Sequence, residues 1–131
     1  MSTFVIDTHA LVWFLSKDPR LSSVARAVLQ DSQSKLIIPA IVLAEIKHLL
    51  PKNRFAFSLE NVFEVLESDP RCLIYPIDYD VIKHAPATLD IHDSLIVGVA
   101  LALGTAVRAV ITRDEAITNS GLVPTLWETH T

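Results

Sequence analysis

Apolar and polar positions alternate along the chain with two periods, one typical of strands and the other of helices. Short apolar runs rich in β-branched and aromatic residues predict strands over residues 4–6, 35–38, 72–77 and 109–112, with a last extended piece near 123–126. Apolar residues at helical spacing predict helices over residues 10–15, 40–50, 55–68, 80–87 and 95–103, and a further helix that begins at Ser22 or Ser23. Strands that alternate with helices predict an α/β fold with a mainly parallel sheet of four or five strands.

The composition fits a sheet that is buried on both faces. Half of the 131 residues are apolar, and the mean hydropathy of +0.39 is high for a soluble protein. In an α/β/α sandwich, helices cover both sides of the central strands, which are therefore apolar throughout. The length fits one domain over residues 1–131, with no repeat, low-complexity tract or linker inside it.

The remaining global properties predict a soluble, cytoplasmic protein. The single cysteine, Cys72, excludes an internal disulfide and fits a reducing compartment. No basic segment followed by a signal-peptide core is expected at the start. The longest apolar run, residues 95–103, is far shorter than the roughly 20 residues of a membrane span, so no membrane partner is expected. The net charge of −4 argues against a broad basic surface for nucleic acid, but not against a local site for divalent cations.

Four acidic residues occupy comparable places in the predicted fold. Asp7 ends the first strand, and Asp114 follows the fourth. Because the carboxyl ends of parallel strands share one edge of a sheet, these two carboxylates are expected at the same edge. Glu45 lies in the helix after the second strand, and Asp93 opens the helix before the fourth, so both helices begin at that edge. We therefore expect the four carboxylates to converge.

Each acid taken alone also has an ordinary structural interpretation. Asp7 could cap the helix that follows it, and Asp114 could be a turn residue. Asp93 could interact with the helix dipole, with Asp90 as the cap three residues earlier. Glu45 is the hardest to explain in this way, because its helix is apolar on nearly every side and buried charges rarely lack a partner. The functional interpretation therefore depends on the four acids together.

Clustered carboxylates favour a site for a hard divalent cation. Like charges at close range raise one another's pKa and destabilise a fold unless a cation joins them. Mg²⁺ and Mn²⁺ prefer oxygen ligands, and such an ion can activate a water and stabilise the leaving oxygen of a phosphodiester. A ligand set without cysteine argues against structural zinc.

Four motifs follow one another along the chain: Ile6-Asp7-Thr8-His9, then Glu45 in an apolar helix, then Ile91-His92-Asp93-Ser94-Leu95-Ile96, then Ile111-Thr112-Arg113-Asp114. In this order and at these separations they resemble the PIN-domain ribonucleases, and especially the VapC-type toxins of prokaryotic toxin–antitoxin pairs. The resemblance covers essentially the whole chain, in length and in the order of its elements.

This resemblance implies a function and an assignment of residues. It implies a PIN-like fold and a nuclease that hydrolyses RNA phosphodiester bonds, that a cognate antitoxin protein inhibits, and that forms a homodimer. It implies that the catalytic residues and ligands of Mg²⁺ or Mn²⁺ are Asp7, Glu45, Asp93 and Asp114. Thr112 matches a hydroxyl residue often found two positions before the last acid, and could position a ligand.

The chain departs from the family pattern in two places. Asp90 lies one turn before Asp93 and could supplement or replace it, although Asp93 directly precedes the apolar helix as in the motif. Family members often carry Ser or Thr about one turn before the helical Glu, where this chain has Ile41 and Val42, so a hydroxyl ligand is not expected from that helix. Neither departure removes an acid.

Other side chains could assist the acids or bind RNA. His9, next but one to Asp7, could hydrogen-bond a carboxylate. The cations that could contact RNA phosphates are Lys47, Lys52, Arg54 and Arg113. Those that follow Glu45 could equally stabilise a helix C-terminus, and Arg113 could be an ordinary surface residue. Trp13 and Trp127 are interpreted as core or interface residues rather than platforms for stacked bases.

Two other functional classes fit parts of the pattern. An aspartyl-phosphate hydrolase needs a second Asp two residues after the first, where this chain has His9. A receiver-like domain needs a lysine after its last strands, and the chain has none beyond Lys83. A non-catalytic RNA- or protein-binding module with the same fold is the other alternative. A protein that only binds a partner, however, has no use for a cluster of negatively charged side chains. The favoured prediction is a metal-dependent endoribonuclease.

Overall fold

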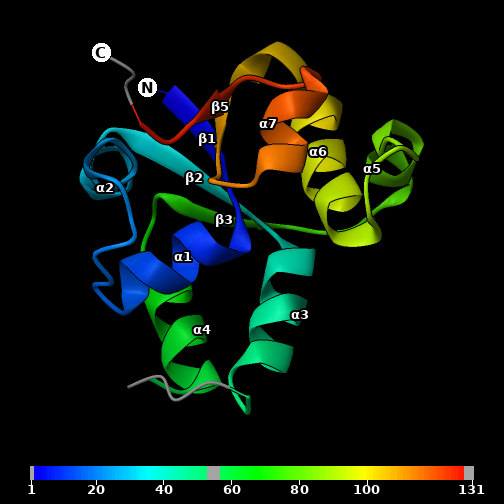
Figure 1. Cartoon of the computed structure of the whole chain (residues 1–131). Helices are drawn as coiled ribbons and strands as arrows, with labels where there is room; N and C mark the ends of the chain where they lie inside the picture. Colours follow the sequence, from blue (N-terminus) through cyan, green and yellow to red (C-terminus); the bar gives the residue numbers. More distant parts are fainter. Residues whose placement is uncertain (1, 53–56, 129–131) are drawn as a thin grey trace.

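A computed structural model describes residues 2–52 and 57–128 of the chain. Its strands form one parallel five-stranded sheet in the order β3–β2–β1–β4–β5 (Figure 1). The strands are β1 (Ser2–Ile6), β2 (Ser34–Pro39), β3 (Cys72–Tyr75), β4 (Val107–Ile111) and β5 (Thr125–Leu126). The predicted α/β class and parallel sheet are therefore confirmed.

Helices cover both faces of this sheet (Figure 1). The helices of one layer are α1 (Thr8–Leu15), α2 (Ser23–Gln30), α3 (Ala40–Leu49) and α4 (Leu59–Ser68). Those of the other layer are α5 (Tyr79–His84), α6 (Ile91–Leu103) and α7 (Glu115–Ser120), with a 3₁₀ turn, η1 (Gly104–Ala106), after α6. The arrangement is an α/β/α sandwich. In the described part of the chain, no helix is both long and apolar enough to cross a membrane.

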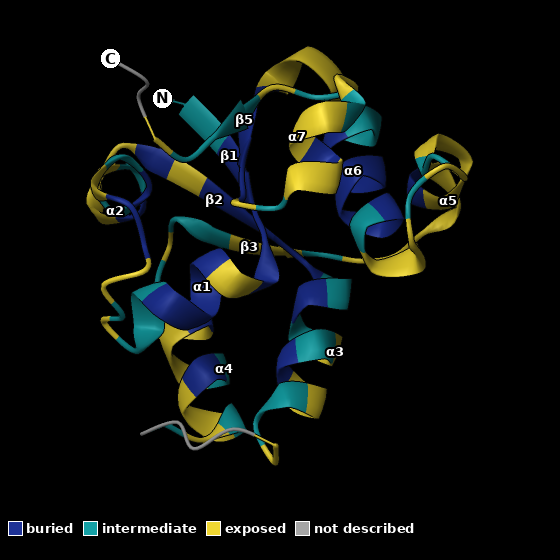
Figure 2. Cartoon of the chain, viewed as in Figure 1, coloured by how far each residue is buried: buried dark blue, intermediate teal, exposed yellow. Residues whose placement is uncertain are grey.

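The core lies at the middle of the sheet, where helices cover both faces. Ile6, Ile38 and Ile111 of the three central strands are fully buried. The edge strand β3 differs, because Leu73 is 45% and Ile74 is 39% exposed (Figure 2). In the described part of the chain β3 lies at the edge of the sheet, so its apolar side chains are less covered than those of the central strands.

Helix α6 packs on β1, β2 and β4 and carries Asp93 in its first turn. It ends at Leu103, and its C-cap Gly104 has a φ of +66°, a value that residues with a side chain rarely adopt. Gly98 allows α6 to approach α5 closely, because a Cβ at this position would lie 2.7 Å from the carbonyl oxygen of Val81. The close contact holds the first turn of α6 at the carboxyl edge of the sheet.

Several element boundaries differ from the predicted ones. α1 begins at Thr8 and α6 at Ile91, each earlier than predicted, because polar residues form their capped first turns. The third strand ends at Tyr75 rather than at residue 77, and residues 55 and 56 of the predicted helix 55–68 lie outside the described residues. Helix α7 was not predicted, because it is short and buries only Ile117, and so lacks a clear apolar period.

Candidate functional site

The candidate site lies at the carboxyl edge of the central strands. Ile6 of β1 pairs with Ile111 of β4, so Asp7 and Thr112, each one residue further, are neighbours at the end of the ladder. The backbone N–H of Asp7 donates a 3.1 Å hydrogen bond to the carbonyl oxygen of Ile111. The topology therefore brings the end of the first strand and the segment before Asp114 together, as predicted.

Asp7 is a buried carboxylate with a partner for each oxygen. Its Oδ1 accepts a 2.6 Å hydrogen bond from the backbone N–H of Thr8, and its Oδ2 accepts one of 2.5 Å from the hydroxyl of Thr112. Burial raises the pKa of Asp7, and the charge of Glu45 acts in the same direction. The two hydrogen bonds and the charge of His9 oppose that rise in the pKa of Asp7 without cancelling it.

Thr8 is a site residue that the sequence analysis did not assign. Its hydroxyl donates a 2.8 Å hydrogen bond to Oε1 of Glu45, and its own side chain is 1% exposed. The sequence feature that could have identified Thr8 is its position directly after Asp7. From the first turn of α1, its hydroxyl reaches the adjacent helix α3.

Asp93 lies close enough to the other acids for its ionisation to depend on them. Partial burial raises the pKa of Asp93 to about 7, together with the charges of Asp114, Asp90 and Asp7 and a side-chain hydrogen bond with Asp90. Asp93 therefore links the acid after β1 with the acid after β4.

Asp90 has a different local role from Asp93. Its Oδ1 accepts hydrogen bonds from the backbone N–H groups of His92 (3.0 Å) and Asp93 (3.1 Å), which makes it the N-cap of α6. These hydrogen bonds, first that from Asp93, lower the pKa of Asp90. The cap interpretation therefore holds for Asp90, and it leaves Asp93 as the acid of the first helical turn.

Asp114 caps α7 and is connected to Asp7 through Thr112. Its Oδ1 accepts a 2.9 Å hydrogen bond from the backbone N–H of Ile117. Its own backbone N–H donates a 3.0 Å hydrogen bond to the hydroxyl oxygen of Thr112, which in turn donates to Asp7. The interpretation of Asp114 as a simple turn residue is therefore incomplete, because it begins a helix beside another acid.

These acids interact with one another, but they do not form a closed set of ligands around a single position. Within residues 2–52 and 57–128, no three His, Cys, Asp or Glu side chains are grouped as the ligands of one ion. The donor chemistry nevertheless fits Mg²⁺ or Mn²⁺, because Asp7, Glu45, Asp93 and Asp114 all offer carboxylate oxygens. Mg²⁺ usually takes one or two carboxylates directly and keeps several waters, so it does not need a closed protein cage.

The predicted cations lie on two sides of the acids. Lys52 lines a pocket of about 540 Å³ together with Glu45, His48 and His92, between α3 and the first turn of α6. Lys47 is exposed on α3, and Arg54 lies outside the described residues. Lys52 is therefore the cation of this group that shares a pocket with a candidate acid.

On the other side, Arg113 and His9 both contact the Trp13 ring. The guanidinium carbon of Arg113 lies 5.1 Å from the ring centroid of Trp13, and the His9 ring centroid lies 5.5 Å away. Among the described residues, no hydrogen bond joins His9 to a carboxylate, and its predicted role beside the acids stays a prediction. The charge of His9 acts on Asp7 by lowering the pKa of the Asp7 carboxyl group.

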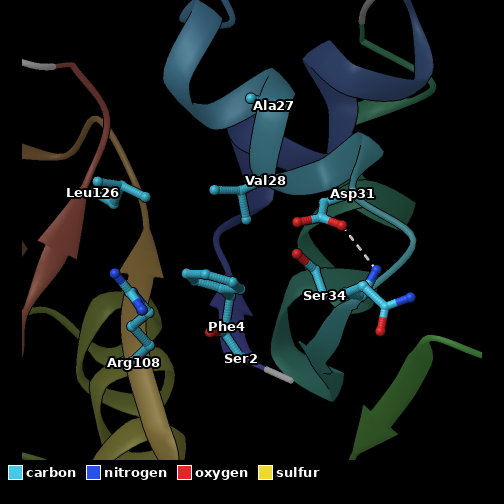
Figure 3. A pocket seen from close by; sticks show the side chains of 9 residues that line it. Ser2, Phe4, Ala27, Val28, Asp31, Ser34, Arg108 and Leu126 are labelled. Atoms are coloured by element: carbon cyan, nitrogen blue, oxygen red, sulfur yellow. Dashed lines mark hydrogen bonds between the residues drawn. The ribbon is translucent and has the colours of Figure 1, made fainter.

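A separate pocket of about 420 Å³ lies at the opposite edge of the sheet (Figure 3). Ser2 and Ser34, at the starts of β1 and β2, line it together with Phe4 and Arg108. The starts of parallel strands lie at the edge away from Asp7, so this pocket is not part of the carboxylate site.

Comparisons with known proteins agree with this geometry. A family model described as the PIN domain matches residues 4–120. No curated protein sequence matches the chain significantly. A chain in the crystal structure of VapBC2 from Rickettsia felis, bound to a DNA fragment from its promoter, is similar with a TM-score of 0.70 and 16% identity, over 96% of this chain and 99% of that chain. That likeness shows a shared fold. The chain belongs to the PIN-domain family.

Proposed function

We propose that this PIN-domain protein is a metal-dependent endoribonuclease that hydrolyses RNA phosphodiester bonds. PIN domains are generally nucleases. The observation that carries the proposal is the set of contacts at one sheet edge: the Thr112 hydroxyl donates to Asp7 and accepts from the N–H of Asp114, and the Thr8 hydroxyl donates to Glu45. Burial and the charges of Asp114, Asp90 and Asp7 accordingly raise the pKa of Asp93. Carboxylates from separate segments at one sheet edge repel one another, and a bound divalent cation would relieve that repulsion.

Asp7, Glu45, Asp93 and Asp114 would hold Mg²⁺ or Mn²⁺ through carboxylate oxygens. When bound, such an ion lowers the pKa of a water and neutralises charge on the phosphodiester. The residues of the chain prepare the site in advance. The Thr8 N–H and the Thr112 hydroxyl orient the two oxygens of Asp7, and the Thr8 hydroxyl orients Glu45. Asp93 would lose its proton when the cation binds, because metal ligands must be deprotonated.

The pocket that contains Lys52 supports an approach path for RNA beside Glu45. Its two histidines and one lysine offer donors to phosphate oxygens, while its carboxylate belongs to the proposed metal site. The substrate backbone would pass along this pocket before it reaches the acids. Lys47, Arg54 and Arg113 are further proposed phosphate contacts.

The decisive experiment is incubation of the purified protein with labelled total RNA and transfer RNA, in Mg²⁺ or Mn²⁺. We expect cleavage that a chelator abolishes and that the Asp93→Asn variant lacks, with circular dichroism to show that the variant is folded. If the protein cuts no RNA, binds no divalent metal and does not arrest growth when expressed, the nuclease proposal fails. A non-catalytic RNA- or protein-binding PIN module would then be the better interpretation.

We also propose that the chain is a cytoplasmic VapC-type toxin that a cognate antitoxin protein inhibits. The supporting observation is the similarity of its fold to a chain of the VapBC2 complex. Expression of the wild-type chain should arrest growth, and expression of Asp93→Asn should not. Co-expression of the antitoxin should restore growth and block cleavage by the purified complex. Growth arrest that persists in Asp93→Asn would contradict the proposal.

A homodimer is proposed from exposed apolar residues on β3, on the segment that follows it and on α5. These exposed residues are Leu73, Ile74, Ile77, Tyr79 and Ile82. Exposed apolar side chains mark interaction surfaces, and within residues 2–52 and 57–128 β3 is an edge strand of the sheet.

Light scattering after size-exclusion chromatography tests this homodimer. The wild type should have the mass of a dimer and Ile82→Lys that of a monomer. Val65→Lys, at an exposed apolar position on α4, is the matched control and should remain a dimer. A monomeric wild type would contradict the proposal.

A further inference from the structure

A second pocket adjoins the carboxylate site on the side of β4 and β5. We call it the Trp127 pocket, and its lining includes Thr112, Arg113, Glu115, Asn119, Trp127 and Glu128. Its volume of about 650 Å³ lies within the roughly 300–1,000 Å³ of small-ligand sites. Thr112 belongs to both sites, because its hydroxyl donates to Asp7. Thr112 therefore connects a group bound in this pocket with Asp7.

Trp127 forms an anchored aromatic wall of the pocket. Its ring packs edge-on against Trp13, with the centroids 5.9 Å apart and an interplanar angle of 63°. Its carbonyl oxygen accepts a hydrogen bond from the hydroxyl of Ser22, which ties the segment after β5 to the start of α2. The residue is only half-buried, so part of it remains accessible. A fixed, accessible indole is a suitable surface for an unstacked base of single-stranded RNA.

Arg113 provides positive charge between the pocket and the acids. Its guanidinium lies against the Trp13 ring, and among the described residues it forms no ion pair. A guanidinium held in place by an aromatic ring but lacking an anionic partner can bind a phosphate with little loss of freedom.

The other polar groups of the pocket are mostly hydrogen-bond acceptors. Glu115 and Glu128 are exposed carboxylates, Asn119 adds an amide and Thr125 a hydroxyl that can each accept or donate. The hydroxyl of Thr118 already donates to the carbonyl oxygen of Asp114, so it remains an acceptor. Two carboxylates disfavour a phosphate inside the pocket but accept hydrogen bonds from the N–H groups of a base. Guanine presents adjacent N1–H and N2–H₂ donors on its pairing edge, whereas uracil presents a single N–H donor. The acceptor-rich lining therefore favours guanine most and uracil least.

We propose that the Trp127 pocket binds an unpaired guanine of the RNA substrate, next to the phosphodiester that is cleaved. Trp127 stacks on the base, Glu115, Glu128 and Asn119 read its edge, and Arg113 binds the adjacent phosphate. This inference rests on the proposed ribonuclease function and deepens it by assigning a base preference to one pocket.

The test measures binding of end-labelled pentanucleotides UUGUU, UUAUU, UUCUU and UUUUU by fluorescence anisotropy. The Asp93→Asn protein is used so that the RNA remains intact. We expect UUGUU to bind about tenfold more tightly than UUUUU. The variant with Glu115→Gln and Glu128→Gln should reduce this ratio to about one, and Asn119→Ala alone should reduce it in part. Glu64→Gln, the same change on an exposed face of α4, should keep the ratio.

The outcomes separate this inference from the proposed function. Equal affinity for the four pentanucleotides overturns the guanine pocket, as does a guanine preference that survives in the double variant. If the wild-type protein still cuts RNA in either case, the ribonuclease proposal stands. If no pentanucleotide binds, the pocket assignment is also overturned, and RNA cleavage by the wild type again decides whether the proposed function fails with it.

Discussion

The hydroxyl of Thr8 donates a 2.8 Å hydrogen bond to Oε1 of Glu45 and so joins the start of α1 to α3 across 37 positions of the chain. The backbone N–H of the same residue donates to Oδ1 of Asp7 at 2.6 Å. One buried residue therefore orients carboxylates from two separate segments. Hydrogen bonds of this kind hold ligands in position and are often as important to a metal site as the ligands themselves.

Thr8→Val should lower RNA cleavage more than it lowers stability. The replacement keeps the shape of the side chain but removes the donor to Glu45, which should then move out of position. Loss of this one hydrogen bond should lower the unfolding free energy by about 1 kcal/mol. Removal of a hydrogen bond to a metal ligand, in contrast, commonly lowers activity or metal affinity by about 10–100-fold. Cleavage rates and urea unfolding measure the two effects. Thr8→Ser, which keeps the hydroxyl, should restore most activity, and its failure to do so would contradict the role of this hydrogen bond.

The metal-free protein should become less stable as the pH rises from about 4 to about 7. The pKa of Asp93 is raised to about 7 in the fold, so the native state binds more protons than the unfolded state within this window. Its unfolding free energy should fall by about 1–2 kcal/mol, after allowance for solvent screening of a partly exposed group. The raised pKa of Asp7 acts in the same direction.

Urea unfolding at pH 5 and pH 8 in chelator checks this dependence. Asp93→Asn should be more stable than the wild type at pH 8 and should show a smaller fall with pH. Glu67→Gln, on an exposed face of α4, should behave as the wild type. A wild-type stability that increases between these two pH values would contradict the prediction.

Gly98→Ala should destabilise the protein and also reduce cleavage. The added Cβ would lie 2.7 Å from the carbonyl oxygen of Val81 and 3.2 Å from the Cα of Ala85, so α6 must move away from α5. Such overpacking should cost about 1–3 kcal/mol. Because α6 carries Asp93, the same shift should displace a candidate acid. Thermal unfolding and cleavage assays measure both effects. Ala102→Ser, which adds one atom at a partly exposed position of the same helix, is the control, and equal effects of the two changes would argue against the close contact.

Lys52→Gln should weaken RNA binding with little dependence on sequence. Lys52 lines the pocket that contains Glu45, and a phosphate contact there contributes one released counterion. The slope of log affinity against log salt should therefore become less steep by about one. Lys35→Gln removes an equal charge at the start of β2, on the opposite edge, and should leave the slope unchanged. If both variants change the slope equally, the contact is not specific to the Lys52 pocket.

The sequence alone determined the architecture and the order of the candidate acids. Buried parallel strands are short, apolar and rich in β-branched residues. The strands at residues 35–38 and 109–112 can therefore be recognised without knowing which strands lie beside them. The rule that parallel strands end at one edge then placed Asp7 with the segment of Asp114. The predicted PIN-domain membership is confirmed by the family match. The short helix α7 was missed because a six-residue helix with one buried side chain leaves no period to detect.

The tertiary structure decided which side chains act on one another. Hydrogen bonds and charge repulsion depend on distances of a few ångströms, and contacts such as Thr8 with Glu45 join segments far apart in sequence. The same reason explains why the pKa of Asp93 responds to burial and to the charges of Asp114 and Asp7, whereas the cap formed by Asp90 is a local contact that the sequence could indicate. It also explains why Trp127, interpreted from sequence as a core or interface residue, forms the wall of a polar pocket. Strand and helix periods are local properties of the chain, whereas the environment of a carboxylate or an indole is set by residues that only folding brings together.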